Sequence, residues 1–385
     1  MGRHIYLDYA AATPLDPTVL KAMQPYLTDQ FYNPSASYLA AKEVRAAITK
    51  SRRQVAAQLG AKEAEIIFTA GATEANNLAI KGVVSDRRDV EIVSSAIEHD
   101  SILAPLADLE KQAVKVHLVK PAKDGRLDPT ALTEAITAKT ILVSLIYANN
   151  EIGTIEPIKE VAQALKLIRQ QRLAEANPLP LYFHTDAAQA ANYLDLHVAR
   201  LGVDLMSLNS GKIYGPKQTG CLYVASHVKL SPLILGGGQE RGLRSGTENV
   251  ANIVGFAAAL DLAQSCRKTE VVRLLGLRQQ FLKLAKRDLP TAFLNGSLKY
   301  RLPNNLNLVI QAQDNERLIM GLDEKGILAA AGSACSASSE TPSHVLTAIG
   351  LTEAEARASL RLTLGRATTT TDIAITVKAL KDLVS

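Results

Sequence analysis

The sequence contains no tryptophan and only three cysteines among its 385 residues. Cys221, Cys266 and Cys335 lie far apart, so neither a disulfide framework nor a zinc site is indicated, and we expect no resident metal. Apolar runs are short and interrupted, which excludes a transmembrane helix. The first residues, MGRHIYLDYA, lack the apolar region of a secretory signal. We therefore expect a cytoplasmic protein with no membrane partner.

An excess of charge of one sign is also lacking. The chain has 43 basic and 38 acidic residues, a formal net charge of +5, and its basic residues are dispersed. Proteins that bind nucleic acid usually gather their basic residues on one face, so we expect no direct contact with nucleic acid. Hydrophobic residues make up 47% of the chain and charged residues 21%, which is typical of a folded globular protein and not of a disordered one.

What the sequence does contain is a regular alternation of apolar runs and helical segments. The runs that predict strands cover 65–70, 90–95, 114–119, 140–147, 181–186, 204–208 and 220–225. Continuous apolar strands separated by helices are typical of a mostly parallel sheet that is covered on both faces. We therefore predict an α/β fold with a mostly parallel seven-stranded sheet between helices. Upstream, residues 35–60 predict one long helix that ends at Gly60.

The pattern changes after about residue 250. A long helical stretch that extends to about residue 288 leads to short helical and strand segments. We predict a large domain over 14–255 and a smaller α+β C-terminal domain over 256–385, which residues 1–13 join.

Polar motifs follow several of the predicted strands, at the edge where open α/β sheets bind ligands. In FTAGATEANN a glycine turn leads into a helix whose N-terminus suits a phosphate, although Thr73 would also serve as an ordinary cap. His99 follows the next strand, and catalytic and structural roles are equally open for it. Asn150 lies in YANNEIG, a loop suited to hydrogen bonding. Asp186 ends a later strand, where it either caps the following turn or holds a cationic ring nitrogen.

One lysine and one cysteine stand in unusual settings. Lys212 lies in MSLNSGKIYGPKQTG, in a tight turn directly behind an apolar strand. A surface lysine needs no such setting, whereas a lysine that must approach a bound cofactor does. Cys335 lies in AAAGSACSASSETPSH, where no bulky neighbour buries it, as expected of an exposed nucleophile. Cys221 and Cys266 are expected to be buried and structural.

A lysine, an acid, a histidine and a phosphate-binding turn at one sheet edge suggest pyridoxal phosphate chemistry. The sequence resembles the cysteine desulfurases, in the class V branch of the fold-type I pyridoxal-phosphate enzymes. The resemblance rests on FTAGATEANNLAIKG, ANNEIG, KIYGPK, RSGT and GSACSAS, and it extends from IYLDYAAATPLDP to SLRLTLGRATT. It implies a fold-type I structure in which the large domain binds pyridoxal 5'-phosphate and the smaller domain carries the catalytic-cysteine loop.

The resemblance implies three catalytic residues. Lys212 would form a Schiff base with the cofactor and carry the α-proton of the substrate. His99 would lie against the cofactor ring and assist proton transfer. The thiolate of Cys335 would attack the sulfur of bound L-cysteine, which leaves L-alanine and a persulfide on Cys335.

Further residues would bind the cofactor and the substrate. The resemblance implies cofactor contacts from Ala72, Thr73, His99, Asn150, Asp186, Gln189, Asn209, Ser210, Gly211 and Lys212. Asp186 would keep the pyridine nitrogen protonated, and Gln189 would bond the ring hydroxyl. Asn150 and Arg361 would bind the substrate carboxylate. Thr247 would reach the phosphate of the neighbouring subunit, which implies a homodimer.

The resemblance also implies a sulfur-acceptor protein, either an iron–sulfur scaffold or a tRNA-thiolation enzyme. Cys335 could transiently share an iron–sulfur cluster with such a scaffold. The sequence departs from the family at Tyr38, Asn209 and Gly211, where the family usually has histidine, serine and histidine. Two other interpretations stay open. One is a selenocysteine lyase or another class V lyase, and the other is a non-catalytic sulfur-relay or regulatory protein.

Overall fold

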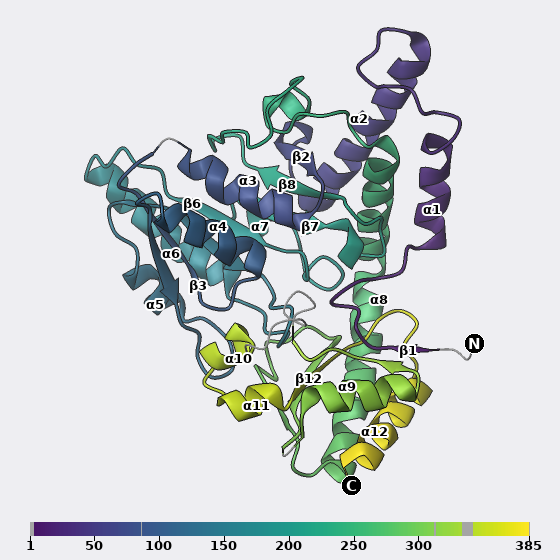
Figure 1. Ribbon diagram of the computed structural model, residues 1–385. Coiled ribbons are helices and arrows are strands. Elements are labelled where there is room, and N and C mark those ends of the chain that lie inside the picture. Colours follow the sequence, from purple (N-terminus) through teal and green to yellow (C-terminus); the bar gives the residue numbers. More distant parts are fainter. Residues whose placement is uncertain (1–3, 86, 312, 333–341, 385) are drawn as a thin grey trace.

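The computed structural model describes residues 4–85, 87–311, 313–332 and 342–384 (Figure 1). The helices are α1 (Pro17–Met23), α2 (Leu39–Leu59), α3 (Ala72–Val84), α4 (Asp100–Glu110), α5 (Pro129–Glu134), α6 (Ile158–Ala174), α7 (Val198–Leu201), α8 (Val250–Asp288), α9 (Asn315–Glu324), α10 (His344–Ala348), α11 (Glu353–Arg357) and α12 (Thr370–Val384). The strands are β1 (Ile5–Tyr6), β2 (Ile66–Thr69), β3 (Glu91–Ser95), β4 (Lys115–Val119), β5 (Thr140–Ile146), β6 (Tyr182–Asp186), β7 (Leu205–Asn209), β8 (Gly220–Val224), β9 (Phe293–Leu294), β10 (Asn305–Val309), β11 (Ile327–Leu328) and β12 (Ser359–Thr363).

Seven strands form one large sheet, in the order β2-β8-β7-β6-β5-β3-β4. Neighbouring strands from β7 to β4 run parallel, whereas β8 is antiparallel to both β2 and β7. Each strand matches one of the predicted strands to within one residue at either end. The predicted mostly parallel α/β sheet is therefore confirmed.

Helices cover both faces of this sheet (Figure 1). Side chains along a strand point to the two faces in turn. Leu142 and Tyr182 accordingly pack in one core with α3 and α4, while Val143 and Phe183 pack in another with α2, α6 and α8. All of β5 is buried, which explains why its sequence is largely apolar instead of alternating.

The long helix predicted over 35–60 begins later than expected, at Leu39. The side chain of Asn33 accepts a hydrogen bond from the Ser35 N–H at 2.9 Å, and such a local turn competes with helix formation. The end of the helix is as predicted. Gly60 adopts a φ of 64°, a left-handed conformation that glycine tolerates best and that commonly ends helices.

A second, smaller unit surrounds the antiparallel sheet β12-β10-β9. β1 pairs with β11, so the N-terminal residues pack with the C-terminal part of the chain. Helix α8 contributes side chains to the cores of both units. Phe256 and Ala263 lie in the core of the large sheet, and Leu274 and Phe281 lie in the smaller core. The predicted division at residues 255 and 256 stays a prediction. Within the described ranges, no helix is long and apolar enough to cross a membrane.

The two cysteines that the structure describes differ in exposure to solvent. Cys221 is buried in β8, as expected. Cys266 is exposed, so its predicted burial was wrong. The reason is its position on the part of α8 between the two cores. Cys335 lies outside the described residues.

Candidate active site

A cavity lies where β5, β6 and β7 end at Ile146, Asp186 and Asn209. The predicted site residues that line it are Ala72, Thr73, His99, Asn150, Asp186, Gln189, Asn209, Lys212 and Arg361. They come from helix starts, strand ends and loops spread over nearly 300 positions of the sequence. The parallel sheet brings them together because the carboxyl ends of its strands share one edge.

The carboxylate of Asp186 is 4% exposed and held from two sides. The Asn76 amide donates to Oδ2 at 2.7 Å, and the Ala188 N–H donates to Oδ1 at 2.9 Å. Asn76 is completely buried in α3, and sequence reasoning missed it. Its only sequence signal was the pair of asparagines after the glycine turn, which suggests nothing specific in a helix. The two donors fix the direction of the carboxylate in the wall of the cavity.

His99 is the N-cap of α4 and has a defined tautomer. Its Nδ1 accepts a hydrogen bond from the Ser101 N–H at 3.0 Å and lies 2.9 Å from the Ser101 hydroxyl. Because a backbone N–H can only donate, Nδ1 carries a lone pair, and neutral His99 holds its proton on Nε2. The Asn76 amide also donates to the Ser101 hydroxyl at 2.8 Å. A hydrogen-bonded chain therefore joins Asp186 to His99 through Asn76 and Ser101.

The turn at Lys212 is built to bring its amine to the cavity. The Asn209 side chain caps the turn by accepting from the Gly211 N–H at 2.9 Å. Tight packing requires glycine at 215, since an added Cβ there would lie 2.1 Å from the Ser210 hydroxyl. The Lys212 amine donates to the carbonyl oxygens of residues 10 and 11, each at 2.7 Å. It is thereby held against the turn at residues 9–11, which also contributes to the cavity wall.

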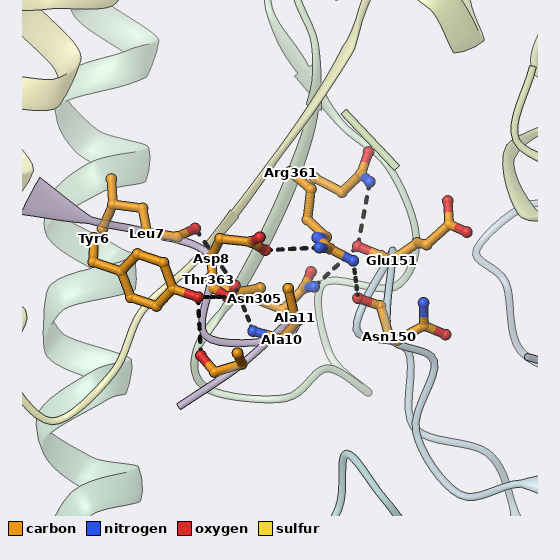
Figure 2. A network of polar contacts seen from close by, with 12 residues as sticks. Tyr6, Leu7, Asp8, Ala10, Ala11, Asn150, Glu151, Asn305, Arg361 and Thr363 are labelled. Atoms are coloured by element: carbon orange, nitrogen blue, oxygen red, sulfur yellow. Dashed lines mark hydrogen bonds and ion pairs between the residues drawn. The ribbon is translucent and has the colours of Figure 1, made fainter. Parts of the chain in front are cut away.

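Arg361 also lines the cavity and lies in a polar network (Figure 2). Its side chain is almost completely buried, and its Nη2 pairs with the Asp8 carboxylate at 2.7 Å. Nη1 donates to the backbone oxygen of Asn150 at 3.3 Å. Nε has no partner among the described residues. A cation that is fixed in this way and retains an unused donor can accept a carboxylate ligand. Sequence reasoning missed Asp8, which lies 353 positions away.

The carboxyl group of Glu98, next to His99 in the chain, is completely buried. Its Oε1 accepts from the Ser95 hydroxyl and from the Ile146 N–H. Burial is the main cause that raises the pKa of Glu98 from 4.5 to about 8, and the negative charge of Asp186 contributes to this rise. At neutral pH Glu98 is therefore protonated.

Three of the predicted residues that the structure describes do not line the cavity. Ser210 is buried, and its hydroxyl lies against Gly215. Gly211 is buried behind Lys212 in the same turn. Thr247 is exposed and lines a separate surface depression. Cys335 belongs to the segment that the structure does not describe.

Comparisons with known proteins agree with this architecture. The model of the family described as Aminotransferase class-V matches residues 5–375. A protein of Dictyoglomus turgidum named "Cysteine desulfurase IscS" is 42% identical over 100% of this chain and 95% of its own length. A protein of Methanosarcina thermophila with the same name is also 42% identical, over 100% of this chain and 92% of its own.

Solved structures show the same fold. One titled "NIFS-LIKE PROTEIN" has a TM-score of 0.90 and 30% identity and covers 99% of both chains. Another, titled "SspA in complex with cysteine", has a TM-score of 0.79 and 36% identity and covers 94% of this chain and 98% of its own. The predicted fold-type I architecture is thus confirmed, and the chain belongs to the class V aminotransferase family.

Proposed function

We propose that the protein is a pyridoxal-phosphate-dependent cysteine desulfurase, which converts L-cysteine to L-alanine and passes the sulfur to an acceptor. The observation that carries the proposal is the presence of the Lys212 amine and the Asp186 carboxylate in the wall of one cavity. Relatives named cysteine desulfurase are 40–42% identical over the whole chain. Pyridoxal 5'-phosphate is the cofactor of this enzyme family.

The residues of the cavity fit this cofactor. An amine suits its aldehyde, and a buried carboxylate suits its ring nitrogen. At the start of α3, an added Cβ on Gly71 would meet no atom within 4 Å. The N-terminus of a helix that begins in open space is suited to a phosphate. Ala72 and Thr73 would hold that phosphate, with help from the turn of Asn209, Ser210 and Gly211.

When bound, pyridoxal phosphate supplies an electron-withdrawing ring that stabilises negative charge at the α-carbon of the substrate. Asp186 would hold the proton on the ring nitrogen, with its direction set by the Asn76 and Ala188 donors. Gln189 would hydrogen-bond the ring hydroxyl. Its amide donates to the carbonyl oxygen of Ala10 at 3.0 Å, which fixes the side chain at the cavity.

Three residues would move protons or bind the substrate. Lys212 would hold the cofactor through a covalent bond. Once its amine is released from that bond, Lys212 would take the α-proton of the substrate. His99 would assist proton transfer through the proton on its Nε2. Arg361 would bind the substrate carboxylate, next to the Asn150 loop to which it is hydrogen-bonded.

The sulfur step would use the thiolate of Cys335. A bond forms between the Cys335 sulfur and the substrate sulfur, and the carbon–sulfur bond of the substrate breaks. In the net reaction one thiol and L-cysteine give one persulfide and L-alanine, so that all atoms and electrons balance. The thiolate is required because the neutral thiol is a poor nucleophile.

The active protein is proposed to be a homodimer in which Thr247 reaches the phosphate of the partner's cofactor. Thr247 is exposed and lies outside the cavity of its own chain. Large apolar side chains are also exposed, among them Phe31 at 70%, Leu39 at 76% and Leu235 at 80%. Exposed apolar groups of this size favour burial against another protein surface.

The sulfur acceptor is proposed to be an iron–sulfur scaffold or a tRNA-thiolation enzyme. A cytoplasmic location is proposed because the reaction needs a free thiol, and the reducing cytoplasm keeps thiols free.

Absorbance and product analysis test the function together. The protein with bound cofactor should absorb in the near-visible range and form L-alanine from L-cysteine. Lys212→Ala should lose this absorbance and form at most trace alanine, while Lys325→Ala, at the exposed end of α9, should behave like the wild type. Wild-type protein that binds no cofactor, or Lys212→Ala protein that turns over freely, would contradict the proposal.

A further inference from the structure

Helices α10 and α11 pack against two loops of the candidate site. They share a separate apolar cluster with these loops, in which Leu346 of α10 packs with Ile97 and Ile152. Ile97 lies two positions before His99, and Ile152 lies two positions after Asn150. The helix pair therefore contacts the loop of a proposed catalytic residue and the loop of a proposed substrate-binding residue.

Two hydrogen bonds fix the start of α10 to the same loops. The Ser343 hydroxyl donates to Oε2 of Glu151 at 2.6 Å. Nε2 of His344 lies 2.9 Å from the backbone oxygen of Glu98 and donates to it, because a carbonyl oxygen can only accept. Glu151 and Glu98 each adjoin a cavity-lining residue in the chain.

The loops themselves are held independently of α10. The backbone oxygen of Glu151 accepts from the amides of Asn305 and Asn307 at 3.0 and 3.2 Å. Its side chain points away from Arg361 (Figure 2), and its Oε2 contacts Ser343 at the start of α10. The Glu98 carboxyl is bonded to β5. Loss of either bond to α10 should therefore move the start of α10 and leave the loops in place.

On the N-terminal side of Cys335, the described chain is fixed in a different way. Ala330 and Arg361 exchange two backbone hydrogen bonds, at 2.7 and 3.2 Å. Side-chain substitutions leave such bonds largely intact. After Cys335 the described chain resumes at residue 342, where the side chains of Ser343 and His344 add two hydrogen bonds to the apolar contacts of α10.

We infer that Ser343 and His344 are positioning residues for the sulfur-transfer step. The inference rests on the proposed role of Cys335, which lies eight positions before Ser343. By holding the start of α10 on the loops of His99 and Asn150, they fix the described chain at the eighth and ninth positions after Cys335. Proton transfer by Lys212 does not need this attachment.

An isosteric pair of substitutions tests the role of Ser343. Its hydroxyl also caps α10, by accepting from the Leu346 N–H at 3.3 Å. Asparagine and aspartate both cap helices well. Ser343→Asn retains a donor for Glu151, whereas Ser343→Asp places two carboxylates together. The aspartate variant therefore loses the hydrogen bond to Glu151, whereas both variants retain the cap of α10.

Two reactions and one physical measurement serve as readouts. In cofactor-loaded Ser343→Asp protein, persulfide formation on Cys335 should fall by about tenfold or more relative to Ser343→Asn, as expected for a lost hydrogen bond to a charged group. Exchange of the α-proton of L-alanine with deuterated water, which needs no thiol, should change by less than about twofold. In the cofactor-free protein, hydrogen exchange should show weaker amide protection of residues 345–349 in the aspartate variant.

The double variant with Ser343→Asp and Glu151→Gln restores a donor and an acceptor, so it should recover most of the transfer rate. His344→Leu should reproduce the defect, and His344→Gln, which keeps a donor, should relieve it. Equal transfer by the aspartate and asparagine variants would overturn the inference. So would a parallel loss of α-proton exchange, which would indicate general distortion of the site. Absence of a persulfide on Cys335 in the wild type would overturn the proposed function, and this inference with it.

Discussion

Replacement of Glu98 by glutamine should make the protein less sensitive to alkaline pH. Glutamine has the shape of the protonated carboxyl group, and its Oε1 can accept from the Ser95 hydroxyl and the Ile146 N–H as Glu98 does. Its amide nitrogen replaces Oε2, which has no partner among the described residues. The change therefore removes one buried titratable group and disturbs little else.

The magnitude follows from the raised pKa. Burial, together with nearby negative charge, raises the pKa of Glu98 from 4.5 to about 8. A carboxyl group whose pKa is higher in the folded state binds its proton more tightly there. Its contribution to stability is fully present below pH 4.5 and is lost as the pH rises through 8. By this linkage, Glu98 should cost the wild type about 3–4 kcal/mol of unfolding free energy between pH 5 and pH 8.

Urea unfolding at pH 5, 6, 7 and 8, with cofactor present at a fixed concentration, would measure this effect. The difference in unfolding free energy between Glu98→Gln and the wild type should grow with pH, by about 3–4 kcal/mol over the series. Glu353→Gln, at an exposed position in α11, should show a nearly constant difference. A Glu98→Gln difference that stays constant within about 1 kcal/mol would refute the assignment of Glu98 as a buried group that is protonated at neutral pH.

Two further substitutions test other features. Asp8→Ala should lower the unfolding free energy by about 3–5 kcal/mol, because it leaves the buried Arg361 cation without its carboxylate partner. The control Glu353→Ala, which breaks an exposed ion pair, should lower it by about 0–1 kcal/mol. Equal losses of unfolding free energy in urea denaturation would contradict the argument. Gly211→His should tighten pyridoxal phosphate binding about tenfold by adding a phosphate donor next to the cavity-lining Asn209. Gly211 has no positive φ, and an added Cβ would lie 3.2 Å from Cδ of Lys217, which must shift slightly, and 3.4 Å from Oδ1 of Asn209. Equilibrium dialysis that shows equal or weaker binding by a folded variant would mean that the phosphate site has no vacancy at this position.

The sequence was informative where local patterns decide the structure. The strands of the large sheet were predictable because each is a compact apolar run bounded by turns and helices. Asp186, His99 and Lys212 were predictable as cavity residues because each follows such a run, and strand ends of a parallel sheet share one edge.

Other features depend on contacts between distant segments, and no local pattern encodes them. Asn76 and Ser101 join Asp186 to His99 only because α3 and α4 pack side by side. The pairing of Asp8 with Arg361 likewise requires the N-terminal segment to join the smaller sheet.

The direction and the exposure of a side chain within an element also could not be predicted from the sequence. Ser210 has the expected place in the chain, yet its hydroxyl turns toward Gly215. Cys266 lies in an apolar helix, but on a stretch that neither core covers.

The central claim is that Cys335 receives sulfur from L-cysteine, and peptide mass spectrometry tests it most directly. The cofactor-loaded protein is incubated with L-cysteine, excess substrate is removed, and free thiols and persulfides are alkylated before digestion. The account predicts that the Cys335 peptide gains one sulfur atom, with one L-alanine formed for each persulfide. The peptides of Cys221, which is buried, and Cys266, which is exposed, should remain unchanged. Formation of L-alanine with the added sulfur on Cys266, or with no sulfur on Cys335, would contradict the account.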